Sequence, residues 1–310
     1  MFASRPPVHS TATSLESTAS VGGFLLYAES ELHFSRESLN KYHSTLMQLE
    51  RGLAGAPLSA LTREDLYRIK ARFIRDGLSD AWLASTLLSL KRYLMYIRDV
   101  EGAVVALDPA QIIPPRRKAR EVVFLTPNEV ERLVGAIRLR NTDGRVSLRG
   151  YRLRALVEML LGSGVRISEL LSIDRGQINL EAKETKIVGK GGRERTVFFT
   201  DRCLDWLSQY QALRDDSCPA LFADLFGRHR MKRTDIWRYF ARLRKDAGIE
   251  KRVTPHILRH TAATQLLFNG CPMAHIKEIL GHSRLETTCR YYLGVDHRAA
   301  KQAHTTYLRY

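Results

Sequence analysis

The sequence predicts a mainly helical protein of two domains: a small helical bundle, then a larger domain of helices with one small antiparallel sheet. Its 310 residues, of which 44% are hydrophobic, suffice for about two packed cores. Apolar residues recur at helical spacing through most of the chain. A proline-containing basic stretch, residues 108–122, interrupts that pattern and marks a linker.

The first predicted domain covers residues 20–107 and consists of four short helices. Each helix shows apolar residues on one face, and three of them begin at a capping residue. Those caps are Ser35, Thr62, and Ser79 or Asp80. Four helices with brief connections form a small bundle. The fourth helix carries Lys91 and Arg92 opposite its leucines, and both are candidate DNA contacts.

Two segments outside the bundle are predicted to be extended. Residues 1–19 are rich in Ser and Thr and lack both a basic start and an apolar run, which indicates a loose tail rather than a secretory signal. In the linker, Pro114 and Pro115 favour a semi-rigid connector. The cluster Arg116, Arg117 and Lys118 follows them. It is either a plain solvated linker or a contact to a phosphate backbone.

The second predicted domain covers residues 123–292 and opens with a capping box, Thr126 to Glu129, with Pro127 at the first helical position. Residues 140–150 are expected to be a loop. We expect helices at 154–161, 168–172, 204–213, 236–245, 256–268 and 273–280. Short strands are expected at 178–180, 186–188 and 196–199, with Gly189 to Gly192 as the turn between the last two.

Positive charge is concentrated in the second domain. The net charge is +16; residues 1–122 carry 16 basic and 13 acidic side chains, whereas residues 123–310 carry 33 and 20. A polyanion such as DNA is the default partner of such a surface, although a merely basic, well-solvated protein would look the same. No apolar run reaches the ~18 residues of a membrane span, so no membrane partner is expected.

Cysteine usage suggests where the protein acts. The four cysteines are widely spaced and form no CxxC pair. They are interpreted as reduced thiols in a cytosolic protein. For a DNA-binding protein, this predicts a cytoplasmic location at the nucleoid.

Arg166 and Lys190 are the first candidate site residues. Arg166 follows Gly162 and Gly164, which allow the backbone to bend and present a long side chain. A guanidinium fork suits two phosphate oxygens, but Arg166 alone is more simply explained by a pair with Glu169. Lys190 lies in a glycine-rich turn, where it can reach a DNA groove or remain a solvated surface lysine. Arg193 and Arg195 on the same hairpin suit phosphate contacts.

His256 and Arg259 lie three residues apart at the start of a predicted helix, so they share a face. Pro255 sets the first turn, and the helix N-terminus adds partial positive charge. Imidazole exchanges protons near neutral pH. His260 lies four residues from His256, but no acidic residue lies between them and an arginine adjoins them, which argues against zinc. We expect His260 to be a buried, hydrogen-bonded residue and no metal to be bound.

His282 and Tyr291 complete the set. His282 follows Gly281, the expected C′ glycine of the 273–280 helix, and often such a histidine only binds backbone carbonyls. An isolated tyrosine such as Tyr291 is usually a core residue, and Tyr292 is a direct competitor. A phenol of pKa ~10 is a weak nucleophile at pH 7 and needs surrounding cations to attack a phosphodiester.

Together these segments resemble the tyrosine recombinase (phage integrase) family, of the compact Xer-like or simple integrase type. The matching segments are GVRISEL at 164–170, GKGGRER at 189–195, PHILRH at 255–260, and LGHS from Leu280, with Tyr291 nine residues after His282. All six active-site positions of the family have a counterpart here: Arg166, Lys190, His256, Arg259, His282 and Tyr291.

The resemblance implies a fold and a reaction. Residues 20–107 would be a SAM-like core-binding domain and residues 123–292 a catalytic domain of the DNA breaking-rejoining type. Tyr291 would attack a phosphate and form a 3′-phosphotyrosyl link. Arg166 and Arg259 would hold the phosphate, Lys190 would be the general acid, His256 the base or proton relay, and His282 a donor to a non-bridging oxygen.

The resemblance also implies partners. These are double-stranded DNA with specific target sites and a homo-oligomer, four protomers on two sites, or a related recombinase. No cofactor is implied. The tail helix at 293–310 would dock on a neighbouring protomer or pack on its own domain. Competing functions are DNA relaxation of the type IB topoisomerase kind and a DNA-binding regulator without catalysis. DNA recombination or integration for a mobile element is the expected task.

Overall fold

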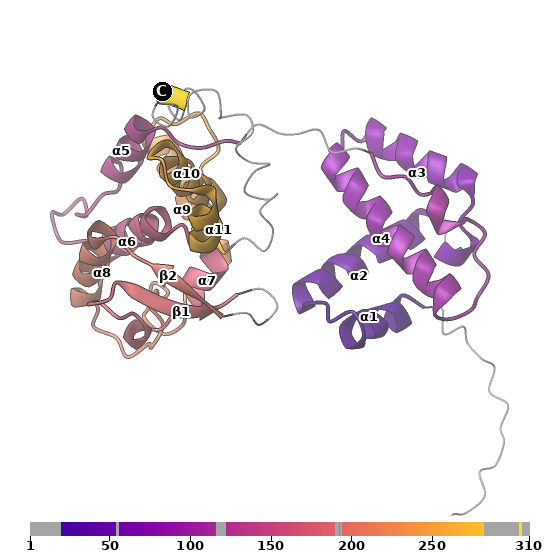
Figure 1. Cartoon of the computed structure of the whole chain (residues 1–310), viewed down its shortest axis with the longest axis horizontal. Coiled ribbons are helices and arrows are strands. Elements are labelled where there is room, and N and C mark those ends of the chain that lie inside the picture. Colours follow the sequence, from indigo (N-terminus) through magenta and orange to yellow (C-terminus); the bar gives the residue numbers. More distant parts are fainter. Residues whose placement is uncertain are drawn as a thin grey trace, which may run out of the picture. The chain divides into compact units, whose positions relative to one another are not determined.

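The structure of the protein is a computed structural model that describes residues 20–53, 56–115, 122–189, 192, 194–281 and 304–305. The chain divides into two compact units, residues 1–119 and 120–310 (Figure 1). The division falls within the linker that the sequence predicts. Each unit has its own hydrophobic core and is described by itself.

The first unit is a four-helix bundle in which every helix begins at a capping residue. Ser20, Ser35, Thr62 and Ser79 each accept a hydrogen bond from a backbone N–H in the first turn of their helix. The helices are α1 (Val21–Ser30), α2 (Arg36–Gly52), α3 (Arg63–Arg75) and α4 (Asp80–Asp99). α4 packs against both α1 and α2 and buries residues around most of its circumference, so it is the central helix.

The segment after α4 belongs to this first core. The short 3-10 helices η1 (Leu58–Ala60) and η2 (Pro109–Gln111) both pack on α4. Leu107 and Ile112 are buried in the same cluster as the bundle. Residues 109–112, which the sequence assigns to the extended connector, therefore belong to the first core, because a 3-10 helix and the buried Ile112 side chain pack there.

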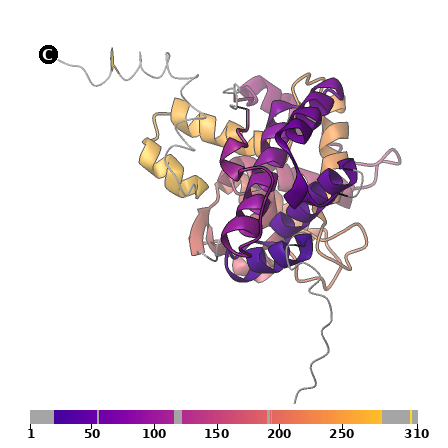
Figure 2. The same cartoon turned by 90° about the vertical axis from the view of Figure 1, so that its right-hand side faces the viewer.

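The second unit is built around α6, which packs against α8 and α10. Figure 1 and Figure 2 show α10 beside α11. Its core combines side chains of α5 through α10 with those of both strands. The elements are α5 (Pro127–Gly135), α6 (Leu148–Ser163), α7 (Ile167–Ser172), η3 (Arg175–Gln177), β1 (Glu184–Val188), β2 (Glu194–Phe198), α8 (Asp201–Ala212), α9 (Arg233–Asp246), α10 (Pro255–Phe268) and α11 (Met273–Leu280).

The sheet has two antiparallel strands, with Ile187 opposite Arg195 in the register. The prediction of a strand at 178–180 is wrong. Asn179 makes only an isolated bridge to Glu184, and its side chain accepts a hydrogen bond from the Ala182 backbone N–H. This side-chain turn folds the segment back before it can extend into a strand.

α6 begins at Leu148, earlier than the sequence indicates, because Ser147 caps it by accepting from the Gly150 N–H. Gly150 lies directly against the carbonyl of Arg138, where a Cβ would come within 2.0 Å of the oxygen. Residue 150, where the predicted loop ends, must therefore be glycine, because the backbone of Arg138 leaves no room for a side chain.

Within the described residues, no helix combines the length and apolar character needed to cross a membrane.

Candidate active site

Arg166 lies between α6 and α7. α6 ends at Gly164, whose left-handed φ of 62° turns the chain so that α7 starts directly after Arg166. Arg166 Nη1 donates to Glu169 Oε1 at 2.8 Å, and its backbone N–H donates to Glu169 Oε2 at 3.0 Å. The pair with Glu169 is present, but a second donor, Nη2, binds the Gly281 carbonyl at 3.0 Å. Arg166 thus reaches from α7 to the end of α11.

Arg259 is the most enclosed of the candidate residues. It lies one turn into α10, which begins at Pro255 after Thr254 accepts from the Ile257 N–H. Its Nη1 donates to the Gly164 carbonyl at 2.7 Å and its Nη2 donates to the Leu280 carbonyl. Only 5% of the residue is exposed. Arg259 therefore fastens α10 to the ends of α6 and α11.

His256 is exposed on the first turn of α10. Partial desolvation by the surrounding protein lowers the pKa of His256, and the charges of Arg259, Arg233 and Arg166 lower it further. A lowered pKa keeps the imidazole neutral at pH 7, the form that accepts a proton. The three arginines that affect it come from α10, α9 and the start of α7, so these elements converge on His256.

His260 was expected to be buried and hydrogen-bonded, and the structure encloses it only in part. It is half-buried on α10, and burial, followed by the charges of His256 and Arg259, lowers its pKa to about 4. In the part of the chain that the structure describes, no three His, Cys, Asp or Glu side chains gather in a way that would hold a metal.

The end of α11 is the point where the candidate site converges. Gly281 ends the helix in the left-handed conformation, as the sequence predicts. Its last carbonyl groups each accept from a different arginine: Ile279 from Arg195, Leu280 from Arg259 and Gly281 from Arg166. Unpaired carbonyls at a helix C-terminus attract cations. Three guanidinium groups are thereby gathered directly before His282.

Arg195 lies where the sequence did not place it. A phosphate contact from the hairpin was expected, but only 14% of its side chain is exposed, and the guanidinium binds Glu169 Oε2 at 2.8 Å and the Ile279 carbonyl at 2.9 Å. Arg233 was missed altogether. Arg233 stands at the start of α9 and is one of several arginines on that helix. Nothing in the sequence distinguishes it from the others.

The DNA contacts predicted on the bundle differ in their surroundings. Arg92 donates to the Tyr42 hydroxyl at 2.8 Å and lies over the Phe34 ring, 5.6 Å from its centroid. It therefore stabilises the bundle as well as offering charge. Lys91 on the same helix is half-buried.

Seven predicted residues lie outside the described part of the chain: Arg116, Arg117, Lys118, Lys190, Arg193, His282 and Tyr291. Gly189 is the described residue before Lys190, and Gly281 is the one before His282. Of the six catalytic candidates, the structure therefore describes Arg166, His256 and Arg259, and it brings these three together.

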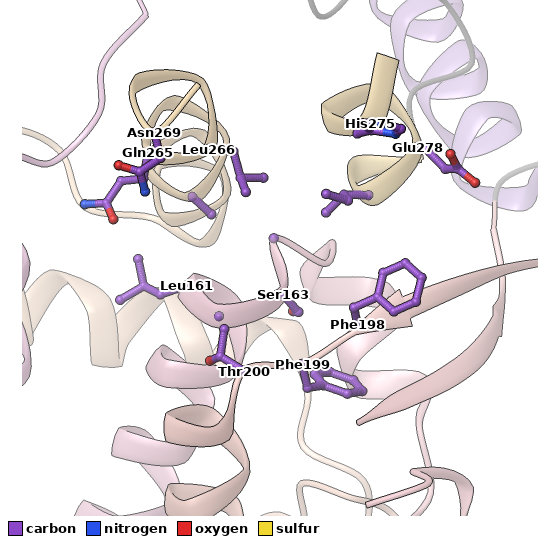
Figure 3. Close-up of a pocket in the computed structure, with 14 residues that line it drawn as sticks. Leu161, Ser163, Phe198, Phe199, Thr200, Gln265, Leu266, Asn269, His275 and Glu278 are labelled. Carbon is purple, nitrogen blue, oxygen red and sulfur yellow. The ribbon is translucent and has the colours of Figure 1, made fainter. Parts of the chain in front are cut away.

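A mainly apolar cavity of about 630 Å³ lies beside this cluster. Figure 3 shows Leu161 of α6, Leu266 of α10 and Phe198 at the end of β2 around it. Phe198 is 48% exposed although its ring is apolar. The cavity borders the candidate site without containing the guanidinium groups, so it is a neighbouring feature rather than the place of the chemistry.

Residues 123–298 match the phage integrase family. The chain belongs to that family. The tyrosine recombinase XerC of Chlamydia caviae is 30% identical over 265 residues, which make up 84% of this chain and 82% of that protein. The tyrosine recombinase XerD of Staphylococcus epidermidis is 28% identical over 278 residues, 86% of this chain and 91% of that protein.

Solved structures of the family share the fold. A lambda integrase dimer bound to a COC′ core site is similar with a TM-score of 0.71 and 19% identity, covering 87% of this chain and 93% of that one. The XerH site-specific recombinase in a post-cleavage complex with palindromic difH has a TM-score of 0.70 and 20% identity, covering 94% and 85%. This phage integrase family member is a site-specific DNA recombinase of the tyrosine type.

Proposed function

We propose that Tyr291 is the nucleophile of this recombinase and that Arg166, Lys190, His256, Arg259 and His282 are the groups that assist it. The observation that carries the proposal is that Arg166 and Arg259 meet at the end of α11, immediately before His282, and that the charges of both act on His256. Arg166 comes from a stretch of sequence far from the one that holds His256 and Arg259, and His282 belongs to a third. Backbone carbonyls at the end of α11 explain why two arginines gather there, but they do not explain the neutral imidazole near both charges.

The charges fit an attack on a phosphodiester. In the pentavalent transition state, negative charge grows on the non-bridging oxygens, and preorganised guanidinium donors lower the barrier. Arg166 and Arg259 are held in place by backbone carbonyls and by Glu169, so little reorganisation is needed when DNA arrives. His256, kept neutral by its lowered pKa, accepts the phenolic proton.

The reaction then balances without an external energy source. The Tyr291 oxygen bonds to phosphorus as the bond to the 5′ oxygen breaks, and Lys190 gives that oxygen its proton. The 5′-hydroxyl of a partner duplex later attacks the 3′-phosphotyrosyl link and releases the tyrosine. One phosphodiester is exchanged for another through the covalent intermediate, so no nucleotide cofactor is required.

A nicked suicide duplex tests the nucleophile. Because the short cleaved strand diffuses away, the wild-type chain is expected to accumulate as a covalent DNA adduct on a denaturing gel. Tyr291→Phe should form no adduct while its affinity for DNA stays within about threefold, since the lost hydroxyl acts only in the chemical step. Tyr292→Phe is the matched control and should react normally. Loss of the adduct in Tyr292→Phe alone would move the nucleophile to that residue.

We further propose a homo-tetramer on two specific DNA sites, assembled in the cytoplasm at the nucleoid. The apolar cavity beside α10 and α11 supports the oligomer, because it offers an apolar surface to a tail helix. A helix at 293–310 would present Val295, Ala299, Ala303 and Tyr307 on one face. We assign the tail of a neighbouring protomer to this cavity. Phe198→Asp should then reduce complexes that contain two DNA sites in native gels while leaving binding to a single site unchanged. Unaltered two-site complexes would contradict the assignment.

DNA relaxation by a type IB topoisomerase-like activity is the competing outcome. A supercoiled plasmid without target sites separates the two, since a site-specific recombinase leaves it supercoiled. Relaxation of that plasmid by wild type but not by Tyr291→Phe would favour the competing function.

A further inference from the structure

Arg195 links three elements around the candidate active site. It lies on β2 opposite Ile187, and its side chain is largely enclosed. Its Nη1 donates to the Ile279 carbonyl at 2.9 Å and its Nη2 donates to Glu169 Oε2 at 2.8 Å. These acceptors lie on α11 and α7, so one side chain ties the sheet to two helices.

The bonds of Arg195 form part of a closed ring. Glu169 binds Arg166 through its other oxygen, Oε1, at 2.8 Å, and Arg166 donates to the Gly281 carbonyl at 3.0 Å. Gly281 and Ile279 are two residues apart on the same helix end, which closes the ring. Each arginine therefore contacts both the shared carboxylate and the end of α11.

The ring also sets the charge near Arg166. Glu169 is 7% exposed. Burial by itself would raise the pKa of Glu169, but the charge of Arg195, followed by the bonds and charge of Arg166, holds it below its ordinary range. Two guanidinium groups around one carboxylate leave a net charge of about +1. With Arg195 removed, Glu169 would neutralise Arg166, the cation that faces the phosphate.

Burying Arg195 between the sheet and the two helices costs free energy. Its Nε–H is buried and has no hydrogen-bond partner within the described residues. The side chain lies directly against Gly281, where a Cβ would come within 2.5 Å of Cδ and Nε. A cation needed only for a phosphate contact or for solubility would not be buried in this way.

We propose that Arg195 is a positioning residue that places Arg166 and the end of α11 for DNA cleavage. This rests on the proposed role of Arg166 and Tyr291. The side chain acts through Glu169 and the Ile279 carbonyl, and it does not itself contact DNA. The β1–β2 hairpin is the anchor to which the ring is fastened.

Single-turnover cleavage of the suicide duplex tests this role. Arg195→Met is expected to slow adduct formation by about a hundredfold, as a misplaced catalytic group does, while the Kd for DNA changes less than threefold. Arg195→Lys should recover part of the rate, because an ammonium can still balance Glu169. Lys186→Met is the matched control: it removes an exposed cation from the same sheet and should cleave normally.

A double-mutant cycle shows whether the effect passes through Glu169. Glu169→Gln, Arg195→Met and the double variant should be strongly non-additive, since both single changes open the same ring. Additive effects would overturn the proposal. The cycle remains informative if Arg195→Met is destabilised, because Arg195→Lys can replace it.

A modified substrate separates this role from action on Lys190. A sulfur atom in place of the 5′ bridging oxygen leaves without needing a proton. This substrate should therefore restore cleavage by the Lys190→Ala variant. It should not restore cleavage by Arg195→Met, because Arg166 and the end of α11 do not act on the leaving group. Relief of Arg195→Met, normal cleavage by it, or a loss of DNA affinity as large as the loss of rate would each overturn the proposal. If wild type itself forms no adduct, the proposed function fails instead.

Discussion

Arg166 and Arg259 donate hydrogen bonds to adjacent carbonyl groups, those of Gly281 and Leu280, at the end of α11. The two arginines lie far apart in sequence. Arg166 directly precedes α7, and Arg259 lies in α10. A helix C-terminus carries partial negative charge, which draws the guanidinium groups together. The same helix end therefore collects the phosphate-binding cations and leads into His282.

Removing Arg259 should impair cleavage far more than DNA binding. Arg259→Ala deletes a donor whose bonds to a phosphate strengthen in the transition state, so we expect adduct formation to fall by about 10²–10³-fold. It also leaves the Gly164 and Leu280 carbonyls without a charged donor, which should lower the free energy of unfolding by about 2–4 kcal/mol. Single-turnover cleavage, Kd and urea unfolding measure the three effects.

Arg259→Lys is the control for charge. It keeps the cation but cannot bind both carbonyls with one planar fork, so cleavage should remain well below wild type. Equal losses of affinity and rate in Arg259→Ala would contradict a transition-state role.

Gly281→Ala should displace the end of α11. The position has a φ of 62°, which costs an L residue about 1 kcal/mol, and the new Cβ would lie 2.5 Å from Arg195 Nε. Arg195 cannot move aside without losing Glu169 or the Ile279 carbonyl. We expect adduct formation to fall at least about tenfold.

Gly270→Ala is the matched control for backbone strain. Gly270 has a φ of 80° in the turn between α10 and α11, but a Cβ there meets nothing within 4 Å. It should lose a similar amount of stability from strain and retain cleavage. Equal cleavage by the two variants would show that the contact with Arg195 is unimportant.

Much of the secondary structure was predictable because its signals are local. The helix at Met273–Leu280 has the predicted boundaries, since Pro272 and Gly281 mark its two ends. The capping box of Thr126 and Glu129 starts α5 as expected. Such caps satisfy backbone groups within one turn, so nearby residues suffice to identify them.

The candidate site was predictable in composition but not in its connections. The cluster of Arg166, His256 and Arg259 followed from motifs, whereas the inward direction of Arg195 did not. An arginine on a hairpin can point to solvent or to the protein, and only the tertiary position of Ile279 and Glu169 decides which. Arg233 escaped notice for the same reason, because its charge acts on His256 only through the folded position of α9.

DNA affinity should fall steeply with salt. Phosphate contacts release condensed counterions, so a protein with several such contacts loses at least about a hundredfold in affinity between 50 and 200 mM salt. Lys91→Gln should reduce the slope of log K against log salt by about one if Lys91 binds a phosphate. Arg92→Gln should in addition destabilise the bundle, because Arg92 also binds Tyr42 and stacks on Phe34. A flat salt response in fluorescence anisotropy would contradict the basic DNA-binding surface.

The second unit should lose stability in mild acid because of His260. Its pKa is about 4 in the folded protein, against an ordinary value of 6.5, so below pH 6.5 the unfolded chain binds a proton that the folded chain does not. Stability is complete above pH 6.5 and decreases as the pH falls toward 4. Between pH 7.5 and 5 the expected loss is about 2 kcal/mol. His256 shifts in the same direction, and the carboxylates titrate mostly below this window.

Urea unfolding in a Trp82→Phe background measures this loss. Of the three tryptophans, Trp82 lies in the first unit and Trp206 and Trp237 in the second, so the remaining fluorescence reports the second unit. His260→Gln cannot titrate, and its stability should change much less between pH 7.5 and 5. His256→Gln, the matched control on the same helix, should retain most of the pH dependence. An equal loss in wild type and His260→Gln would show that a group other than the His260 imidazole takes up the proton.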